Sequence, residues 1–278
     1  MASDPRPGPS PAIPGSGSAE LPTLAEELFA LRFELIALAN SALAGKSERW
    51  VDGFVPETTA YAHRRRYELA ASRAAGRRVL DLSCGAGAGS RAMAVAGATS
   101  VLGVDIDPDA IRYARHRHSH ERCRFVQGDA ETWSSDSRFD LIVSFETIEH
   151  LEKPETLLAT IERVLAPGGE CLISTPVASE AGSRPTNPYH LQEWTRQEFV
   201  TMLRTAGFSI ADTWYQGVRP HGGLAGRARR GLARLLSSGR EGTALAHGEG
   251  LLESADFYRR SGLRPKFQVH LVHHADAS

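Results

Sequence analysis

The stretch VLDLSCGAGAGS, residues 79–90, decides the fold because it joins a strand pattern to a glycine-rich loop. Its first four residues, VLDL, are typical of a buried β-strand and are interrupted only by Asp81. Gly85, Gly87 and Gly89 follow, and glycine-rich turns between a strand and a helix let backbone N–H groups approach a ligand closely. The stretch therefore predicts the first strand and loop of a nucleotide-binding sheet.

Short apolar runs alternate with helical patterns further along the chain. The runs are RVLDLS, SVLGVD, RFVQGD, FDLIVSF and ECLISTP, and helical spacing fills residues 89–97, 108–119 and 154–165 between them. This alternation is typical of βαβ units in a doubly wound, mostly parallel α/β sheet. Two later runs, FSIADTWYQ and KFQVHLVHH, predict an antiparallel strand pair that closes the sheet.

Composition predicts additions around this core. Leucines recur at helical spacing between residues 21 and 44, with acids on the other face, which predicts an amphipathic cover helix packed on the core. Five segments are expected: a disordered Pro/Gly/Ser-rich head (1–20), a helical N-terminal cover (21–77), the ligand-binding core (78–218), a helical insertion or lid (219–263), and the last strand and tail (264–278).

Charge and cysteine content narrow the cellular setting. The formal net charge is −1, so no whole-chain field indicates a nucleic acid or a membrane surface as partner. The three cysteines are far apart and form no CxxC pair, which favours a reducing, cytoplasmic setting. The chain begins without a signal-peptide pattern and has no apolar stretch of the roughly 18 residues that a membrane span needs. No pattern indicates an oligomeric state.

Asp81 distinguishes between two ligands that such a loop could hold, a dinucleotide such as NAD and S-adenosylmethionine. A carboxylate placed 4 Å from a pyrophosphate would meet like charge at a cost of about 4 kcal/mol in an effective dielectric near 20. The same carboxylate near the amino group and sulfonium of S-adenosylmethionine is favourable. Asp81 therefore favours the sulfonium cofactor, with a nicotinamide-dependent oxidoreductase as the alternative.

Two more acids follow the next strand patterns. Asp105 ends GVD and could accept hydrogen bonds from both ribose hydroxyls, while Asp129 ends VQGD and could accept one from the adenine amino group, with Ala130 beside the ring. Each acid alone could equally be a turn residue or a helix cap. Acids at three successive strand ends favour one shared pocket.

These motifs resemble, as an ordered set, the class I S-adenosylmethionine-dependent methyltransferases. The matching segments are VLDLSCGAG, GVDIDPDAI, QGDAE, FDLIVSFETIEHL and RVLAPGGECLIST. The resemblance implies a Rossmann-like, seven-stranded sheet whose last strand is antiparallel. It also implies that Tyr61 and His63 could close over the cofactor, although a helix packed on the sheet explains that segment equally well. The cofactor-binding residues that it implies are Asp81, Gly85, Gly87, Asp105, Ile106, Asp129, Ala130 and Phe145.

A group of acids and histidines follows the fourth strand pattern: Glu146, Glu149 and His150, with His190 after the fifth. In one interpretation His150 or His190 is a general base for the acceptor, a role that suits histidine near neutral pH. In the other, all four residues bind a divalent metal such as Mg²⁺. Their arrangement is similar to that of small-RNA 3′-terminal 2′-O-methyltransferases and of ubiquinone-pathway O-methyltransferases.

The sequence as a whole predicts an enzyme that methylates oxygen, nitrogen or carbon of a small-molecule acceptor, such as a secondary metabolite or a quinone- or lipid-like compound. A metal-assisted RNA 3′-terminal 2′-O-methyltransferase is one alternative. The arginines of residues 227–240 offer it a local basic patch, but the near-zero net charge and the lack of an RNA-binding motif argue against nucleic acid. A non-catalytic protein that binds the cofactor is the other alternative.

Overall fold

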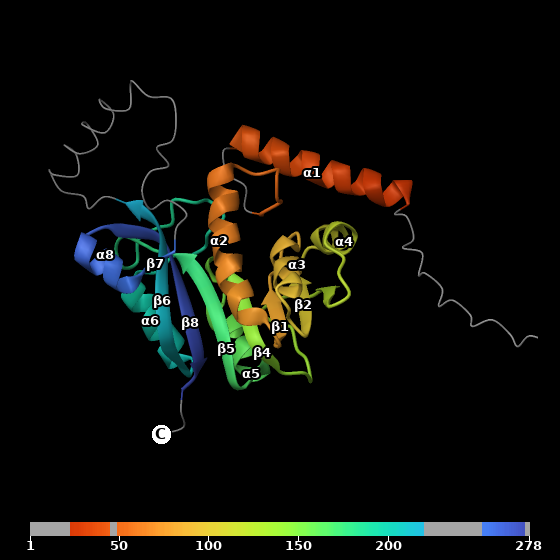
Figure 1. The fold of residues 1–278 in the computed structure, drawn as a ribbon. Helices are drawn as coiled ribbons and strands as arrows, with labels where there is room; N and C mark the ends of the chain where they lie inside the picture. Colours follow the sequence, from red (N-terminus) through yellow and green to blue (C-terminus); the bar gives the residue numbers. More distant parts are fainter. Residues whose placement is uncertain (1–22, 45–48, 220–251, 276–278) are drawn as a thin grey trace, which may run out of the picture.

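The structure is a computed structural model that describes residues 23–44, 49–219 and 252–275 (Figure 1). Its centre is one sheet with the strand order β3-β2-β1-β4-β5-β8-β6-β7. The strands are β1 (Arg78–Leu82), β2 (Ser100–Asp105), β3 (Cys123–Gln127), β4 (Phe139–Phe145), β5 (Leu165–Pro176), β6 (Phe208–Arg219), β7 (Glu253–Ser254) and β8 (Arg264–His274).

Neighbouring strands from β3 to β5 pair in parallel, and β8 lies antiparallel to both β5 and β6. The doubly wound, mostly parallel fold and the closing antiparallel pair are therefore confirmed. The prediction of seven strands was one short, because the two-residue β7 pairs with Trp214 and Tyr215 at the edge of β6. A strand this short carries no hydrophobic period that a sequence could reveal.

Helices cover both faces of the sheet. They are α1 (Leu24–Ala44), α2 (Glu57–Ala74), α3 (Ala88–Val95), α4 (Pro108–Arg117), the 3₁₀ turn η1 (Ile148–His150), α5 (Pro154–Val164), α6 (Arg196–Thr205) and α8 (Ala255–Ser261). One core cluster joins the sheet to α2, α3 and α4, and a second joins the other face to α5 and α6. Alternation along β1 places Val79 in the first cluster and Leu80 in the second.

Helix α1 contains the predicted leucine stripe, but the stripe faces away from the protein, and the inward face combines acids with Phe29, Ala30, Phe33 and Ala37. The acids face the body of the protein: Glu34 is buried and accepts hydrogen bonds from Tyr113 (3.0 Å) and Arg117 (2.9 Å) of α4. The leucines face away from it, with exposures between 45% and 75% for Leu24, Leu28, Leu31, Leu35 and Leu38. Figure 1 shows α1 as a long helix at one end of the molecule, near α2 and α4.

The predicted outer segments are only partly described. Of the insertion predicted over residues 219–263, the described part after residue 251 forms β7 and α8. The arginine-rich residues 227–240 and the predicted head, residues 1–20, lie outside the described residues. Of the helices that are described, none combines the length and the apolar content that crossing a bilayer requires.

Candidate active site

A cavity of about 620 Å³ opens at the carboxyl ends of the parallel strands, where ligands bind in doubly wound sheets. The loop after β1 and the ends of β2 and β4 form one side of it. Helices α1 and α2 and the segment between them form the other. Six of the predicted cofactor-binding, catalytic and metal-binding residues line this cavity: Gly85, Asp105, Ile106, Phe145, Glu146 and His150. His63, which the resemblance placed over the cofactor, lines it as well.

Asp81 lies behind the glycine loop rather than on the cavity surface that the described residues form. It is fully buried, and its carboxylate accepts hydrogen bonds from the Tyr67 hydroxyl (3.1 Å) and the Ser90 hydroxyl (2.5 Å). Burial is the main cause that raises the pKa of Asp81 to about 7, against the lowering effect of the two hydrogen bonds. A cation bound in front of the loop would favour the ionised carboxylate.

The glycines of this loop are required by packing. A Cβ on Gly87, which has a φ of +89°, would lie 2.6 Å from the Cβ of Ala114. A Cβ on Gly89 would lie 2.1 Å from the ring of Tyr67. Gly87 therefore shapes the loop from the core side, while Gly85 is the loop glycine that reaches the cavity.

Asp105 is fixed by the loops on either side of it. Its two carboxylate oxygens accept hydrogen bonds from the backbone N–H of Gly85 (2.8 Å) and of Asp107 (3.0 Å). Arg49 reaches across the same edge, 2.5 Å from Asp107 and 3.8 Å from Asp105. The Asp107 side chain also caps α4 by accepting from the N–H of Asp109 (2.8 Å).

The residues predicted to hold adenine have structural roles in the described residues. Asp129 accepts hydrogen bonds from the N–H of Glu131 (2.9 Å) and the hydroxyl of Thr132 (3.4 Å), as a turn aspartate does. Ala130 is buried in the second core cluster. Neither residue lines the cavity, so adenine binding by Asp129 and Ala130 stays a prediction.

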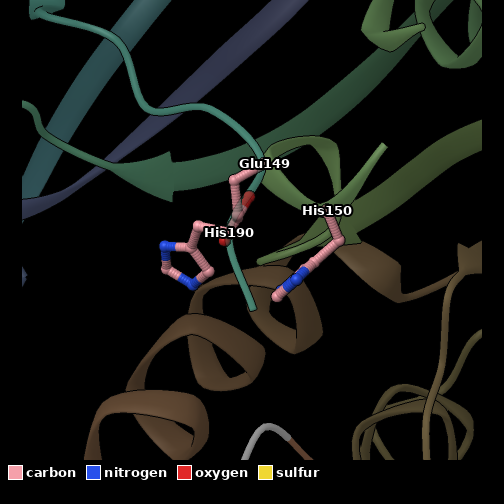
Figure 2. A group of neighbouring side chains, drawn as sticks. All are labelled: Glu149, His150 and His190. Atoms are coloured by element: carbon pink, nitrogen blue, oxygen red, sulfur yellow. The ribbon is translucent and has the colours of Figure 1, made fainter. Parts of the chain in front are cut away.

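Figure 2 shows three of the four predicted metal ligands side by side, Glu149 and His150 from η1 and His190 from the loop between β5 and α6. One possible ligand atom from each lies within 4.8 Å of the others. Glu149 is fully buried, and Thr175 donates to its Oε2 (3.1 Å), while Oε1 has no hydrogen-bond partner in the described residues. Burial, reinforced by the charge of Glu146, raises the pKa of Glu149 well above its usual value.

The fourth predicted ligand, Glu146, is not part of this group of three. Its carboxylate accepts a hydrogen bond from Ser174 (2.7 Å) and lies 3.7 Å from the buried Arg66. Its backbone has a φ of +54°, and in the described residues Ser83 is the other non-glycine residue with positive φ. Both residues line the cavity, and strained backbone of this kind concentrates at functional sites.

The two predicted proton acceptors have different surroundings. His150 lines the cavity and pairs its Nδ1 with the carbonyl of Tyr189 (3.0 Å). His190 has both ring nitrogens engaged, Nδ1 with Glu193 (2.7 Å) and Nε2 with Asn187 (2.8 Å). His190 does not line the described cavity, and its lone pair is occupied, so the geometry favours His150 for contact with an acceptor.

A row of four rings lies along the cavity, and the sequence predicted only His63 and Phe145 among them. Trp50 stacks on His63 and on Tyr67, with ring centroids 5.7 Å apart in each pair, and Tyr67 meets the edge of Phe145 at 5.2 Å. The sequence singled out His63 but not Trp50 or Tyr67. The four-residue spacing of His63 and Tyr67 within HRRRYE was the signal available, because it places both rings on one face of a helix.

A methyltransferase domain model matches residues 74–213. A protein of Mycolicibacterium smegmatis named as a probable S-adenosylmethionine-dependent methyltransferase is 36% identical over 197 residues, which cover 66% of this chain and 72% of that protein. The chain belongs to the S-adenosylmethionine-dependent methyltransferases. It is an enzyme whose cofactor is S-adenosylmethionine, which excludes the nicotinamide and non-catalytic alternatives.

Other relatives of this methyltransferase are more distant. The 2-methyl-6-phytyl-1,4-hydroquinone methyltransferase of Arabidopsis thaliana is 31% identical over 114 residues, 38% of this chain and 34% of that enzyme. Among solved structures, the [4+2]-cyclase SpnF superposes with a TM-score of 0.56 at 20% identity, covering 91% of this chain and 97% of its own. A Burkholderia thailandensis 1,6-didemethyltoxoflavin-N1-methyltransferase gives 0.52 at 20%, covering 93% of both. These likenesses show the fold.

Proposed function

We propose that this methyltransferase acts on a small, largely apolar acceptor that carries a hydroxyl group, such as a quinol-like compound. The observation that carries the proposal is that one cavity is lined both by the glycine loop, where the cofactor would bind, and by apolar side chains that could contact a small acceptor. Gly85 and Asp105 line this cavity, and Phe33, Trp50 and Phe145 contribute apolar surface to it. The hydroquinone methyltransferase among the relatives supports an acceptor of this class.

The proposed chemistry assigns parts of the cavity to each reactant. The loop at Gly85 would hold the methionine portion of the cofactor and Asp105 the ribose, with the charge of Asp81 acting from behind the loop. The acceptor hydroxyl would lie near Glu146 and His150, at the end of β4. Methyl transfer from the sulfonium is an in-line displacement, so holding the acceptor atom about 3–3.5 Å from the methyl group supplies much of the rate enhancement.

A metal-assisted version of the reaction is the second candidate. The buried Oε1 of Glu149, unpartnered in the described residues and grouped with two imidazoles, favours it. Glu149, His150 and His190 would hold the ion, and His190 would have to give up its contact with Asn187. Two imidazoles and one carboxylate suit Mn²⁺ or Zn²⁺ better than the predicted Mg²⁺. The ion would lower the pKa of a hydroxyl bound to it.

The test has a binding arm and a turnover arm. Isothermal titration with S-adenosylmethionine measures cofactor binding, and mass spectrometry then looks for a gain of one CH₂ on a panel that includes 2-methyl-1,4-hydroquinone and matched aromatic amines. Turnover of hydroxyl compounds supports the proposal, whereas turnover of the amines alone contradicts it. A rate of methyl transfer that is unchanged in the presence of a chelator contradicts the metal-assisted version.

A further inference from the structure

His63 occupies a position in the cavity that neither predicted proton acceptor shares. It lies on α2 one helical turn before Tyr67, so the two rings project from the same face. Tyr67 reaches down to Asp81 behind the cofactor loop, and Trp50 stacks between the two rings. The row from the cofactor loop outward is therefore Asp81, Tyr67, Trp50 and His63, and it ends on the cavity wall.

The ring nitrogens of His63 are available to a ligand. In the described residues, neither nitrogen makes a hydrogen bond, and the ring's one aromatic contact is its stack on Trp50. His150 and His190, by contrast, each use a ring nitrogen to hold the loop around Tyr189. A histidine that lines a cavity without a protein partner is positioned to bind what enters that cavity.

The charges around His63 favour its neutral form. Burial and the positive charge of Arg66, on the next turn of α2, lower the pKa of His63 well below its usual value. Arg66 is itself paired with Glu146 across the cavity wall, and His150 is the other titratable histidine on that wall. The lowered pKa keeps the ring neutral, with its lone pair available, throughout the physiological pH range, and it also makes the imidazolium short-lived once a proton has been accepted.

We propose that His63 is the proton acceptor for the methyl transfer, a role that rests on the hydroxyl-bearing acceptor proposed above. The bond from sulfur to the methyl carbon breaks as the bond from that carbon to the acceptor forms. The hydroxyl proton passes to a ring nitrogen of His63. The products are S-adenosylhomocysteine, whose sulfur is now a neutral thioether, the methylated acceptor and an imidazolium that returns its proton to water. His150 then positions the hydroxyl rather than deprotonating it.

The decisive comparison uses His63→Gln with 2-methyl-1,4-hydroquinone as the acceptor and His120→Gln, in the turn before β3, as the matched control. At pH 7 we expect kcat of His63→Gln to fall by about 10²–10⁴-fold, while Kd for S-adenosylmethionine changes less than twofold. Its rate should then rise about tenfold per pH unit as the phenol ionises without help. The parent rate should stay flat down to pH values below the ordinary histidine pKa.

Three results would overturn the assignment. One is a kcat for His63→Gln within threefold of the parent at pH 7, and another is a parallel pH profile for the two proteins. The third is loss of cofactor binding in both His63→Gln and His63→Asn, which would assign the ring to cofactor binding instead. Failure of the parent itself to methylate any hydroxyl compound would contradict the proposed function, so the two failures are distinguishable.

Discussion

At the scale of single residues, Asp81 is held in place by the fold, directly behind the loop at which the sequence predicted a charge for the cofactor. The sequence predicted a negative charge at the loop and inferred a cationic ligand, and the family assignment confirms that ligand. The sequence could not show that Tyr67 and Ser90 hold this carboxylate behind the loop. Those partners come from other elements, and only the folded chain brings them together.

Cofactor binding should depend on the ionisation of Asp81. Because the pKa of Asp81 is raised to about 7 and a nearby cation favours its ionised form, the affinity for S-adenosylmethionine should rise by up to tenfold per unit between pH 6 and 7 and level off above pH 8. At pH 8, Asp81→Asn should bind more than tenfold more weakly, since a charge about 8 Å away contributes about 2 kcal/mol at an effective dielectric of 20. Isothermal titration measures both effects.

The exposed Asp140, which pairs with Arg78 away from the cavity, is the control, and Asp140→Asn should leave both values unchanged. S-adenosylhomocysteine lacks the sulfonium charge and should lose less affinity in Asp81→Asn. If the affinity of the parent protein for S-adenosylmethionine is constant from pH 6 to 8, Asp81 does not contribute its charge to cofactor binding.

The same carboxylate makes the cofactor-free protein less stable at high pH. The folded-state pKa of Asp81 lies above its unfolded value, so the free energy of unfolding falls as pH rises from about 4 to about 7. Asp81→Asn should therefore match the parent in thermal unfolding at pH 4 and exceed it by at least about 1 kcal/mol, roughly 2–4 °C in Tm, at pH 8. Equal Tm differences at both pH values would contradict this origin.

At the scale of elements, α1 shows that a periodic pattern can predict a helix without predicting which of its faces packs against the protein. The leucine spacing predicted the helix, and the structure has it over Leu24–Ala44. It could not predict which face turns inward, because the partner of the acids is a set of basic side chains on α4. Glu26, Glu27 and Glu34 pair there with Arg112, His116 and Arg117. Ion pairs between two helices that are far apart in the sequence produce no pattern that can be recognised in either helix alone.

Substitutions on α1 should therefore have effects opposite to those of an ordinary cover helix. Glu34→Ala leaves the Tyr113 hydroxyl without its acceptor and Arg117 with Glu27 alone, and we expect it to weaken the packing of α1 on α4 by about 1–3 kcal/mol. Leu35→Gln, on the adjacent exposed position, should change stability by less than about 0.5 kcal/mol. Hydrogen exchange of the α1 amides reports both, and faster exchange in Leu35→Gln than in Glu34→Ala would reverse the assignment of the two faces.

At the scale of the whole molecule, the strand order explains why the sequence predicted the architecture so well. The motifs at the ends of β1, β2 and β4 follow one another along the chain, and parallel pairing brings them to one edge of the sheet. The part of the wall that Arg49 and Trp50 contribute was not predicted. Its contacts join segments with no repeat or spacing in common, so that part of the site depends on the tertiary fold.

Removal of the last strand should abolish the fold. Strand β8 lies between β5 and β6 and pairs with both, and its buried residues complete the two core clusters. A chain that ends at Gly262 should therefore lose its cooperative thermal transition, while one that ends at Ala275 should keep it, because Ala275 donates the last backbone bond, to Gly207 (2.9 Å). A cooperative transition in the shorter chain would show that β5 and β6 can close the sheet without β8.

This strand order also constrains how the protein is made. Strands β5 and β6 leave the ribosome before β8. The position between them in the sheet therefore stays unfilled until residues 264–274 have been synthesised. During that interval the edge of β5 offers unpaired backbone groups to any neighbouring nascent chain. Slow translation of the stretch before β8 should therefore raise the fraction of chains captured by chaperones.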